Sequence, residues 1–218
     1  IDDTMKYLVT ILIIFQFSLG QIAQEGIPYS RIQNLEANSE VIALPTVNID
    51  ALLAEDSYQP SGTPYRYGYI HMGDYSVDNS GEWLELDDGG LIWQIHFKSA
   101  NAYALSFEYE KFHIPEGGEL YIYTPGYEMV HGAYTHINNT STQTFATPHI
   151  QGDEAIIEYY QPGNIEGIFY LSVSEIIHDY RDIMDFSENG RDWECGVNVI
   201  CEADASYQGA INSVAFLD

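Results

Sequence analysis

The strongest constraint on the fold is a regular alternation of side chains between Leu91 and Tyr123. In residues 91–98 (LIWQIHFK) every second side chain is large and apolar, and residues 103–110 (YALSFEYE) and 119–123 (ELYIY) repeat the pattern. Successive side chains of a strand point to opposite faces, so a period of two indicates a sheet with one buried and one wetter face. We therefore predict a meander of three strands here, onto which the rest of the chain packs.

The remaining segments also predict short strands separated by turns. Asp87-Asp88-Gly89-Gly90 predicts a hairpin turn, because aspartate and glycine tolerate positive φ. One helix of one or two turns is predicted at 48–56, with Asn48 or Asp50 as its cap. Further strands are predicted at 41–45, 65–72, 82–86, 129–135, 142–146, 154–160 and 168–177. Many short strands with closely spaced turns predict an all-β fold, an antiparallel β-sandwich of jelly-roll or Greek-key type.

The charge balance excludes one large class of partners. The chain has 33 acidic and 7 basic residues, a formal net charge of -26. A phosphate backbone would be repelled, so we expect no nucleic-acid binding. Solubility in a salty exterior explains such acidity, and binding of cations or of a basic partner is the alternative. We favour solubility.

The N-terminus has the pattern of an export signal. Residues 1–4 precede the first methionine, and we interpret them as upstream residues. A lysine at position 6 is followed by an apolar run over 7–17 and by small residues before Gln21. This pattern predicts a signal peptide cleaved between Gly20 and Gln21. The alternative is a transmembrane anchor, but the apolar run is shorter than the roughly 20 residues that a membrane span needs. We expect a secreted, monomeric mature protein without a membrane segment.

The composition changes after Arg181. Residues 182–194 are polar and acidic and predict an exposed linker, whereas 195–218 have the pattern of the opening strands of a new unit. The predicted divisions are therefore 1–20 (upstream residues and signal peptide), 21–181 (sandwich), 182–194 (linker) and 195–218. The last piece ends before a second core could form, and we expect it to be truncated. Cys195 and Cys201 could bond to each other or to partners elsewhere.

Two stretches suggest a family. One is Leu171–Arg181 (LSVSEIIHDYR), and the other is Cys195–Cys201 (CGVNVIC) followed by Ser213–Leu217 (SVAFL). Together they resemble the pro-region and mature N-terminus of secreted bacterial serine proteases of the lysyl-endopeptidase type. In that family a signal peptide precedes a β-rich propeptide that ends in a His-x-Tyr-Arg phrase. A loop follows, and then a Cys-x-x-x-Val-x-Cys segment opens a trypsin-like double β-barrel.

The resemblance implies a function based on binding. The chain would be the propeptide of a zymogen: it would assist folding of the downstream protease domain, its expected partner, and inhibit it temporarily. The Ser-His-Asp triad of such enzymes lies in Thr-Ala-x-His-Cys and Gly-x-Ser-Gly phrases, and neither occurs in residues 1–218. No catalytic residue is therefore assigned here, and we expect this fragment to be inactive. The resemblance also implies that Cys195 and Cys201 pair with later cysteines.

The distribution of basic residues bears on how the enzyme would be released. No lysine follows Lys111, and Arg191 is the one basic residue in the linker. A strictly lysine-specific enzyme could not free itself there. Our hypothesis is cleavage between Arg191 and Asp192 by an arginine-cutting relative or another protease.

Histidines and acidic turns are the candidate metal sites in the sequence. His131, His136 and His149 match no standard zinc spacing, so no metal or cofactor is assigned. Structural calcium at Asp87-Asp88 or in the 151–154 turn is the alternative to ordinary solvated turns, which we favour.

A second hypothesis for function comes from the aromatic residues. Exposed Trp83, Tyr121, Tyr123 and Tyr160 would suit a secreted carbohydrate-binding or adhesion module. The ordinary alternative is cross-strand pairs that stabilise the sheet. We interpret the segment from His178 to Arg181 as a polar cluster that anchors the last strand.

Overall fold

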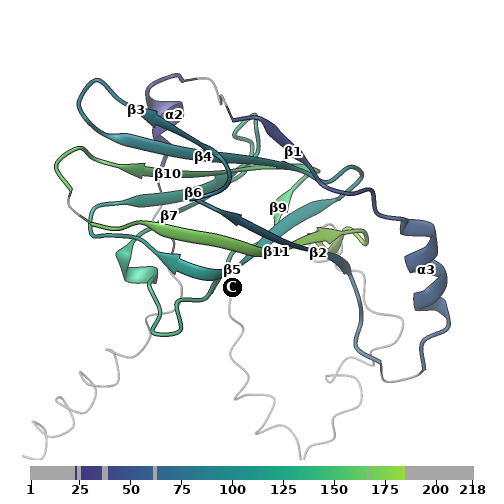
Figure 1. Cartoon of the computed structure of the whole chain (residues 1–218). Coiled ribbons are helices and arrows are strands. Elements are labelled where there is room, and N and C mark those ends of the chain that lie inside the picture. The colour runs from purple at the N-terminus through teal and green to yellow at the C-terminus, as the bar shows by residue number, and fades with distance from the viewer. Residues whose placement is uncertain (1–22, 24–25, 36–38, 61–62, 166, 185–218) are drawn as a thin grey trace, which may run out of the picture. The chain divides into compact units, whose positions relative to one another are not determined.

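Two β-sheets stack face to face in the computed structural model, which describes residues 23, 26–35, 39–60, 63–165 and 167–184 (Figure 1). The chain divides after Ile183 into two compact units, and the sandwich belongs to the first. The predicted all-β sandwich is confirmed.

The first sheet has six strands and the second has five. The first runs in the order β1 (Val41–Ala43), β4 (Leu91–Lys98), β10 (Glu154–Gln161), β6 (Glu119–Tyr123) and β7 (Val130–Tyr134), with β3 (Glu82–Glu85) also paired with β4. The second runs β2 (Gly68–Ser76), β11 (Tyr170–Asp179), β5 (Ala104–His113), and then β8 (Phe145–Ala146) and β9 (Ile150–Gln151), which both pair with β5. The pairing is antiparallel except between β1 and β4.

The predicted meander is wrong in its pairing, although its three strands exist. β4 and β6 lie in the six-stranded sheet with β10 between them, whereas β5 crosses to the other sheet. The crossing follows Ser99, where Ala102 N–H donates to the Ser99 carbonyl and Asn101 has φ +67°. Alternation determines which side chains share a face, but it does not specify the neighbouring strand.

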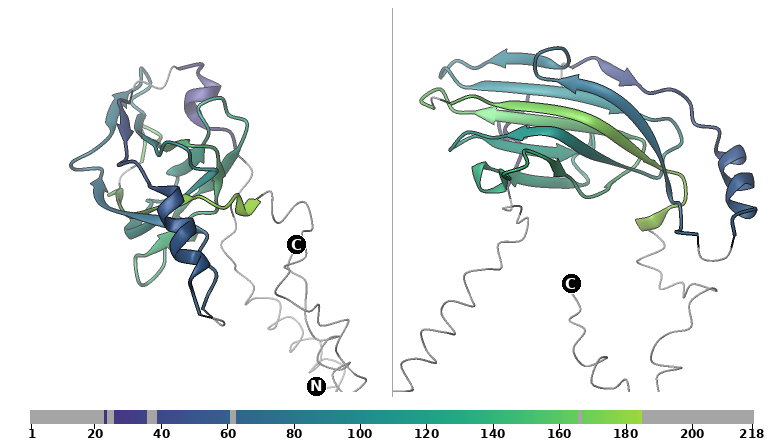
Figure 2. Two further views of the ribbon diagram at one scale, coloured as in Figure 1. Left: turned by 90° about the vertical axis from the view of Figure 1, so that its right-hand side faces the viewer. Right: turned by 60° about the horizontal axis from the view of Figure 1, so that its bottom comes forward.

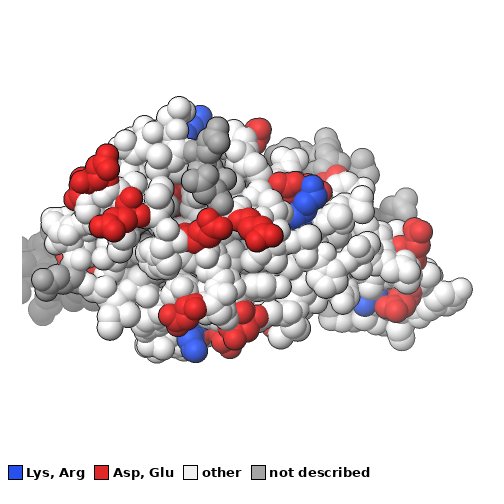
Figure 3. All heavy atoms as spheres, turned by 45° about the horizontal axis from the view of Figure 1, so that its top comes forward, with Lys and Arg blue, Asp and Glu red and all other residues white. Residues whose placement is uncertain are grey.

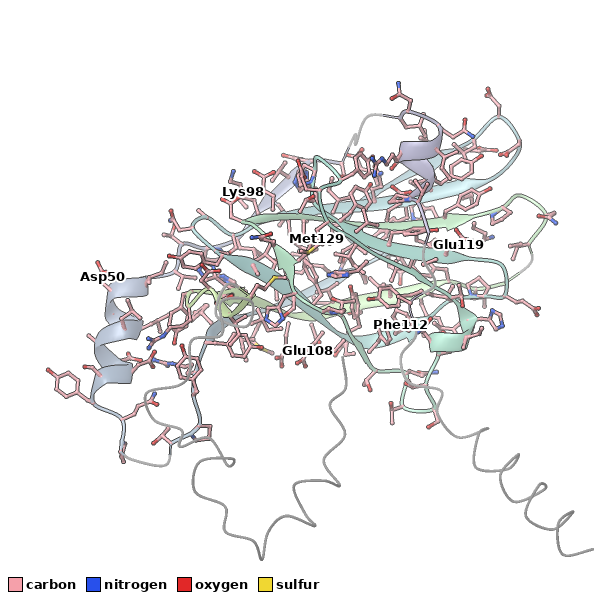
Figure 4. The ribbon with its side chains drawn as sticks, turned by 180° about the vertical axis from the view of Figure 1, so that it is seen from behind. Asp50, Lys98, Glu108, Phe112, Glu119 and Met129 are labelled. Carbon is pink, nitrogen blue, oxygen red and sulfur yellow. The ribbon has the colours of Figure 1, made fainter. Side chains whose placement is uncertain are left out.

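The core lies between the sheets. It is formed by the alternating apolar side chains of the central strands, among them Trp93, Phe97, Phe107, Ile157 and Val173, all with 0 % exposure. Burial of each such side chain contributes about 1.5–3 kcal/mol. Figure 4 labels Lys98 in β4 and Glu108 in β5, which mark the two layers.

Three helices complete the described part: α2 (Tyr29–Ile32), α3 (Ile49–Ser57) and η1 (His136–Asn138). The predicted helix at 48–56 is confirmed as α3, and Asn48 is its cap, since its Oδ1 accepts from Ala51 N–H at 3.1 Å. Two views in Figure 2 show α3 at one end of the sandwich. The structure describes no helix long and apolar enough to cross a membrane.

Candidate functional site on the outer face of the six-stranded sheet

The outer face of the six-stranded sheet carries an unusual row of polar residues. Alternation directs Trp93 and Ile157 into the core, so their neighbours Gln94 and Glu158 point outward from adjacent strands. We expected this face to be the wetter one, and that is wrong: Gln94 is 7 % exposed and Glu158 is 0 % exposed. Tyr123 of β6 is also fully buried beside them.

Residues 26–35, here called the strap, cover this polar row. The strap includes α2, which lies over the upper sheet in Figure 1, and Ser30 at its centre is 1 % exposed. A Cβ atom on Gly26 would lie 2.6 Å from the Tyr121 hydroxyl, so a larger residue at this position would force the Tyr121 ring to shift.

Four donors converge on the Glu158 carboxylate. The backbone N–H of Ser30 donates to Oε1 at 3.0 Å, and the Ser30 hydroxyl donates to Oε2 at 2.5 Å. Gln94 Nε2 and the Tyr123 hydroxyl donate to Oε2 at 2.9 and 2.6 Å. A buried charge without an ion pair requires such donors, and among the described residues no ion pair is found for Glu158. Ser30, Gln94, Tyr123 and Glu158 are here called the latch.

Aromatic contacts hold the strap on either side of the latch. Tyr29 stacks on Tyr160 with ring centroids 3.9 Å apart. The Arg31 guanidinium lies 5.1 Å from the ring of Tyr127, which stacks on Tyr123. Burial, followed by the negative charge of Glu158, raises the pKa of Tyr123. Burial and the hydrogen bond with Tyr29 raise the pKa of Tyr160 to about 12. The hydroxyl groups of Tyr123 and Tyr160 therefore keep their protons at neutral pH.

A small cavity of about 80 Å³ lies between the strap and β3. Its lining includes Ser30, Gln94 and Ser39, and the Ser39 hydroxyl is buried without a hydrogen-bond partner. The volume accommodates two or three water molecules and is far below the ~300 Å³ at which ligand pockets begin. The strap therefore fills the polar face at Ser30, and a more open hollow of about 410 Å³ lies beside it, lined by Tyr29, Gln33, Leu35 and residues 84–88.

A second buried polar cluster lies near the crossing from β4 to β5. The Ser99 hydroxyl lies 2.7 Å from His178 Nδ1 and 3.2 Å from His71 Nε2. One hydroxyl has one proton, so it donates to at most one of the two imidazoles and accepts from at least one of them. Ser99 is 1 % exposed and His178 is 0 % exposed, which makes the cluster inaccessible to a substrate.

The predicted anchor at the end of the last strand is confirmed. Asp179, which has no exposed surface, accepts from the N–H groups of Arg181 and Ile183 at 2.7 and 2.9 Å. The Tyr180 hydroxyl donates to Asp56 Oδ2 at 2.7 Å, and Arg181 pairs with the same oxygen at 2.6 Å. This arrangement, here called the clasp, joins β11 to α3.

Arg66 completes the clasp. Its guanidinium pairs with Asp56 Oδ1 at 2.7 Å and with Glu55 at 3.0 Å. Burial opposes ionisation of Asp56, but the hydrogen bonds from Arg181, Tyr180 and Arg66 lower its pKa overall.

The residues predicted for processing and disulfide formation lie outside the described part of the chain. They are Gly20, Gln21, Arg191, Asp192, Cys195 and Cys201. The predictions made for them therefore remain predictions.

The candidate metal residues are placed as follows. His131 Nε2 lies 2.8 Å from the His149 carbonyl oxygen, while His136 is exposed in η1. Asp87 and Asp88 lie in a turn, and Glu154 binds Lys98 and His96. The described residues contain no group of three or more His, Cys, Asp or Glu side chains that could hold a metal.

The predicted aromatic platform is wrong for two of its four members. Tyr121 and Tyr123 are 2 % and 0 % exposed because the strap covers them. Tyr160 lies under Tyr29, and Trp83, at 46 % exposure, is the one large exposed ring of the four.

The latch and the strap were not predicted from the sequence. The available signal was Glu158, the one charged residue within the otherwise apolar and aromatic stretch from Ala155 to Tyr160. Nothing in the sequence identified Ser30 as its partner.

No family model matches the chain, and no solved structure matches it significantly.

Proposed function

We propose that the chain is the exported pro-domain of a trypsin-like serine protease that cuts after basic residues. The sandwich acts by binding: it assists folding of the protease domain and inhibits it until the linker at 182–194 is cut. The protease domain begins in the segment from Cys195, and its catalytic residues lie beyond Asp218.

The observation that carries this proposal is the clasp. The resemblance to the protease pro-regions rests on the phrase His178-Asp179-Tyr180-Arg181, and each of these residues has a defined structural task. His178 holds Ser99, Asp179 fixes the next turn, and Tyr180 and Arg181 bind Asp56. The phrase thus fixes the end of β11 and joins it to α3, and in the proposed pro-domain the linker to the enzyme follows directly after it.

Inhibition by the separate sandwich tests the proposal. The segment 21–191 is added to the matching mature protease, and hydrolysis of a lysyl or arginyl amide is followed. We expect inhibition, and we expect Asp56→Ala to weaken it because the clasp loses its shared acceptor. Asp50→Ala, on the exposed first turn of α3, is the matched control and should inhibit like the unchanged sandwich.

The coding sequence gives an independent test. Downstream of the codon for Asp218 we expect Thr-Ala-x-His-Cys and Gly-x-Ser-Gly phrases in the same frame. A stop codon or an unrelated enzyme there, or no inhibition by the segment 21–191, would overturn the proposal.

A further inference from the structure

Two of the five described basic residues, Lys98 and Lys111, lie in strands, which protects the bonds after them from proteolysis. Lys98 ends β4, between β1 and β10, and the next residue, Ser99, is 1 % exposed. Lys111 is exposed within β5, but its neighbour Phe112 is 1 % exposed and stacks on Phe145. A protease must bind the residues around the bond in extended form, so cleavage at either lysine requires unfolding of a sheet.

Two more are held in the clasp. Arg66 binds Glu55, Asp56 and the Tyr180 hydroxyl. Arg181 binds Asp56, and Asp179 accepts from the backbone N–H groups of Arg181 and Ile183, which hold the chain just before and just after the Arg181–Asp182 bond. Neither guanidinium can enter a specificity pocket without first losing these ion pairs.

Arg31 differs from these four. It is exposed, and the residue after it, Ile32, is 59 % exposed. Arg31 lies in α2, a helix of four residues, which is too short to be stable without tertiary contacts. Among the basic residues that the structure describes, it is the one with exposed side chains on both sides of the bond that follows it.

We infer that the Arg31–Ile32 bond is a second processing site, at which a protease specific for basic residues cuts the domain and releases the part of the strap that ends at Arg31. In this hydrolysis the C–N bond breaks, and the water oxygen bonds to the Arg31 carbonyl carbon to give a carboxylate. The nitrogen leaves as the amine of Ile32 and takes up a proton. The identity of the physiological protease rests on the proposed function, whereas the site itself does not.

The latch controls access to this bond. Ser30, immediately before Arg31, is buried and donates both its N–H and its hydroxyl to Glu158. The segment can enter a protease cleft only while these bonds are open. The rate of cleavage is therefore proportional to the fraction of molecules in which the strap is open, provided that opening and closing are faster than cutting.

Cleavage makes the release of the strap irreversible. Before the cut, the covalent link keeps Ser30 and Tyr29 beside Glu158 and Tyr160 at a high effective concentration. After the cut, the short piece that ends in Arg31 is held only by its own contacts and dissociates on dilution. Glu158 then loses two of its four donors, so the sandwich becomes less stable and is removed more readily.

Limited proteolysis of the chain with trypsin, followed by mass spectrometry, tests the inference. Within the described residues we expect the first cut after Arg31, followed by loss of the piece that ends there. Arg31→Gln should abolish this cut and prolong the survival of the sandwich, even though it also removes the contact of Arg31 with the Tyr127 ring, which by itself would loosen the strap. A first cut after Lys98, Lys111, Arg66 or Arg181 would overturn the inference.

A pair of serine variants tests the control by the latch. Ser30→Ala should raise the rate of cleavage after Arg31 about tenfold or more, because a hydrogen bond to a buried carboxylate is lost. Ser174→Ala is the matched control: its hydroxyl bonds to the Glu108 carbonyl at 3.3 Å, away from the latch, and its rate should stay within about twofold. Equal rates for both variants would contradict gating by Ser30.

The two proposals fail separately. If trypsin cuts after Arg31 but the sandwich inhibits no protease, the pro-domain function is refuted and the processing site at Arg31 still stands. An inhibitory sandwich whose Arg31–Ile32 bond survives trypsin while another internal bond is cut would refute the site alone.

Discussion

Glu158 shows how a single charged residue can be accommodated inside a β-sandwich. Its carboxylate has no exposed surface and accepts from Ser30, Gln94 and Tyr123, the first of which lies 128 positions away in the sequence. The hydrogen bonds compensate for lost hydration only while all donors are present. The residue therefore couples the strap to the sheet.

Glu158→Ala should lower the free energy of unfolding by about 3 kcal/mol, because buried donors lose their acceptor. Urea denaturation measures this change. Glu108→Ala, an exposed glutamate on a strand of the other sheet, should change it by less than about 0.5 kcal/mol. Equal losses for the two variants would show that the Glu158 carboxylate has no special structural role.

Two buried histidines, His71 and His178, and the half-buried His149 should make stability depend on pH. Burial lowers the pKa of His71, and burial together with the neighbouring His71 lowers the pKa of His178 against the opposing charge of Asp179. Burial also lowers the pKa of His149. The unfolded chain, with histidine pKa values near 6.5, binds protons first as the pH falls.

Stability should therefore be constant with respect to these groups above pH 6.5 and fall as the pH drops below it. The slope is at most about 1.4 kcal/mol per pH unit for each histidine, until the lower pKa of the folded state is passed. Urea denaturation between pH 5 and 8 measures it. His71→Gln should reduce the slope, and His136→Gln, at an exposed position, should leave it unchanged. A slope that is the same in His71→Gln would contradict this assignment.

At the scale of elements, α3 is held by the clasp and by its cap at Asn48. None of its residues is buried, and its described ties to β11 run through Asp56 to Tyr180 and Arg181. An isolated helix of nine residues is not stable in water. The helix is therefore retained by the clasp and its cap.

Asp56→Ala should release α3 while the sheets remain folded. We expect backbone amides of Ile49–Ser57 to exchange with solvent at least tenfold faster, and those of β4 and β10 to keep their protection, since the core is untouched. Hydrogen exchange resolved by peptide measures both. Asp50→Ala, in the first turn of the same helix, removes at most about 1 kcal/mol of dipole stabilisation and should have a smaller effect. Loss of protection in β4 would show instead that the clasp supports the whole sandwich.

At the scale of the whole molecule, repulsion between like charges dominates the electrostatics. Acidic side chains are spread over the face in Figure 3, with few basic ones among them. The chain has 33 acidic and 7 basic residues, so most carboxylates have no basic partner. Such an excess destabilises the compact state.

Adding salt should therefore stabilise the protein. At 0.01 M ionic strength the screening length is ~30 Å, and at 0.1 M it is ~10 Å. We expect the free energy of unfolding at pH 8 to rise between 0.01 M and ~0.5 M NaCl, and KCl to act alike because screening depends on ionic strength. A decrease with salt would mean that the few ion pairs, such as Lys98 with Glu154, outweigh the repulsion.

The sequence by itself determined most of the strands and the fold class, but not the two-residue strand β9. Alternation in β4, β5 and β6 and the cap at Asn48 are local properties, and each can be recognised within a few residues. The polar cluster at the end of β11 was also predicted, because its members are adjacent in the chain.

Only the tertiary structure decided which strands are neighbours, which aromatic rings are buried and where the strap lies. Tyr123 has the alternation of a half-exposed strand residue, yet it is covered by a segment that begins some 90 positions earlier in the chain, as its contact with Ser30 shows. The partners of Glu158 likewise come from the strap, β4 and β6. Contacts between distant segments depend on how the whole chain folds back on itself, and no local pattern encodes them.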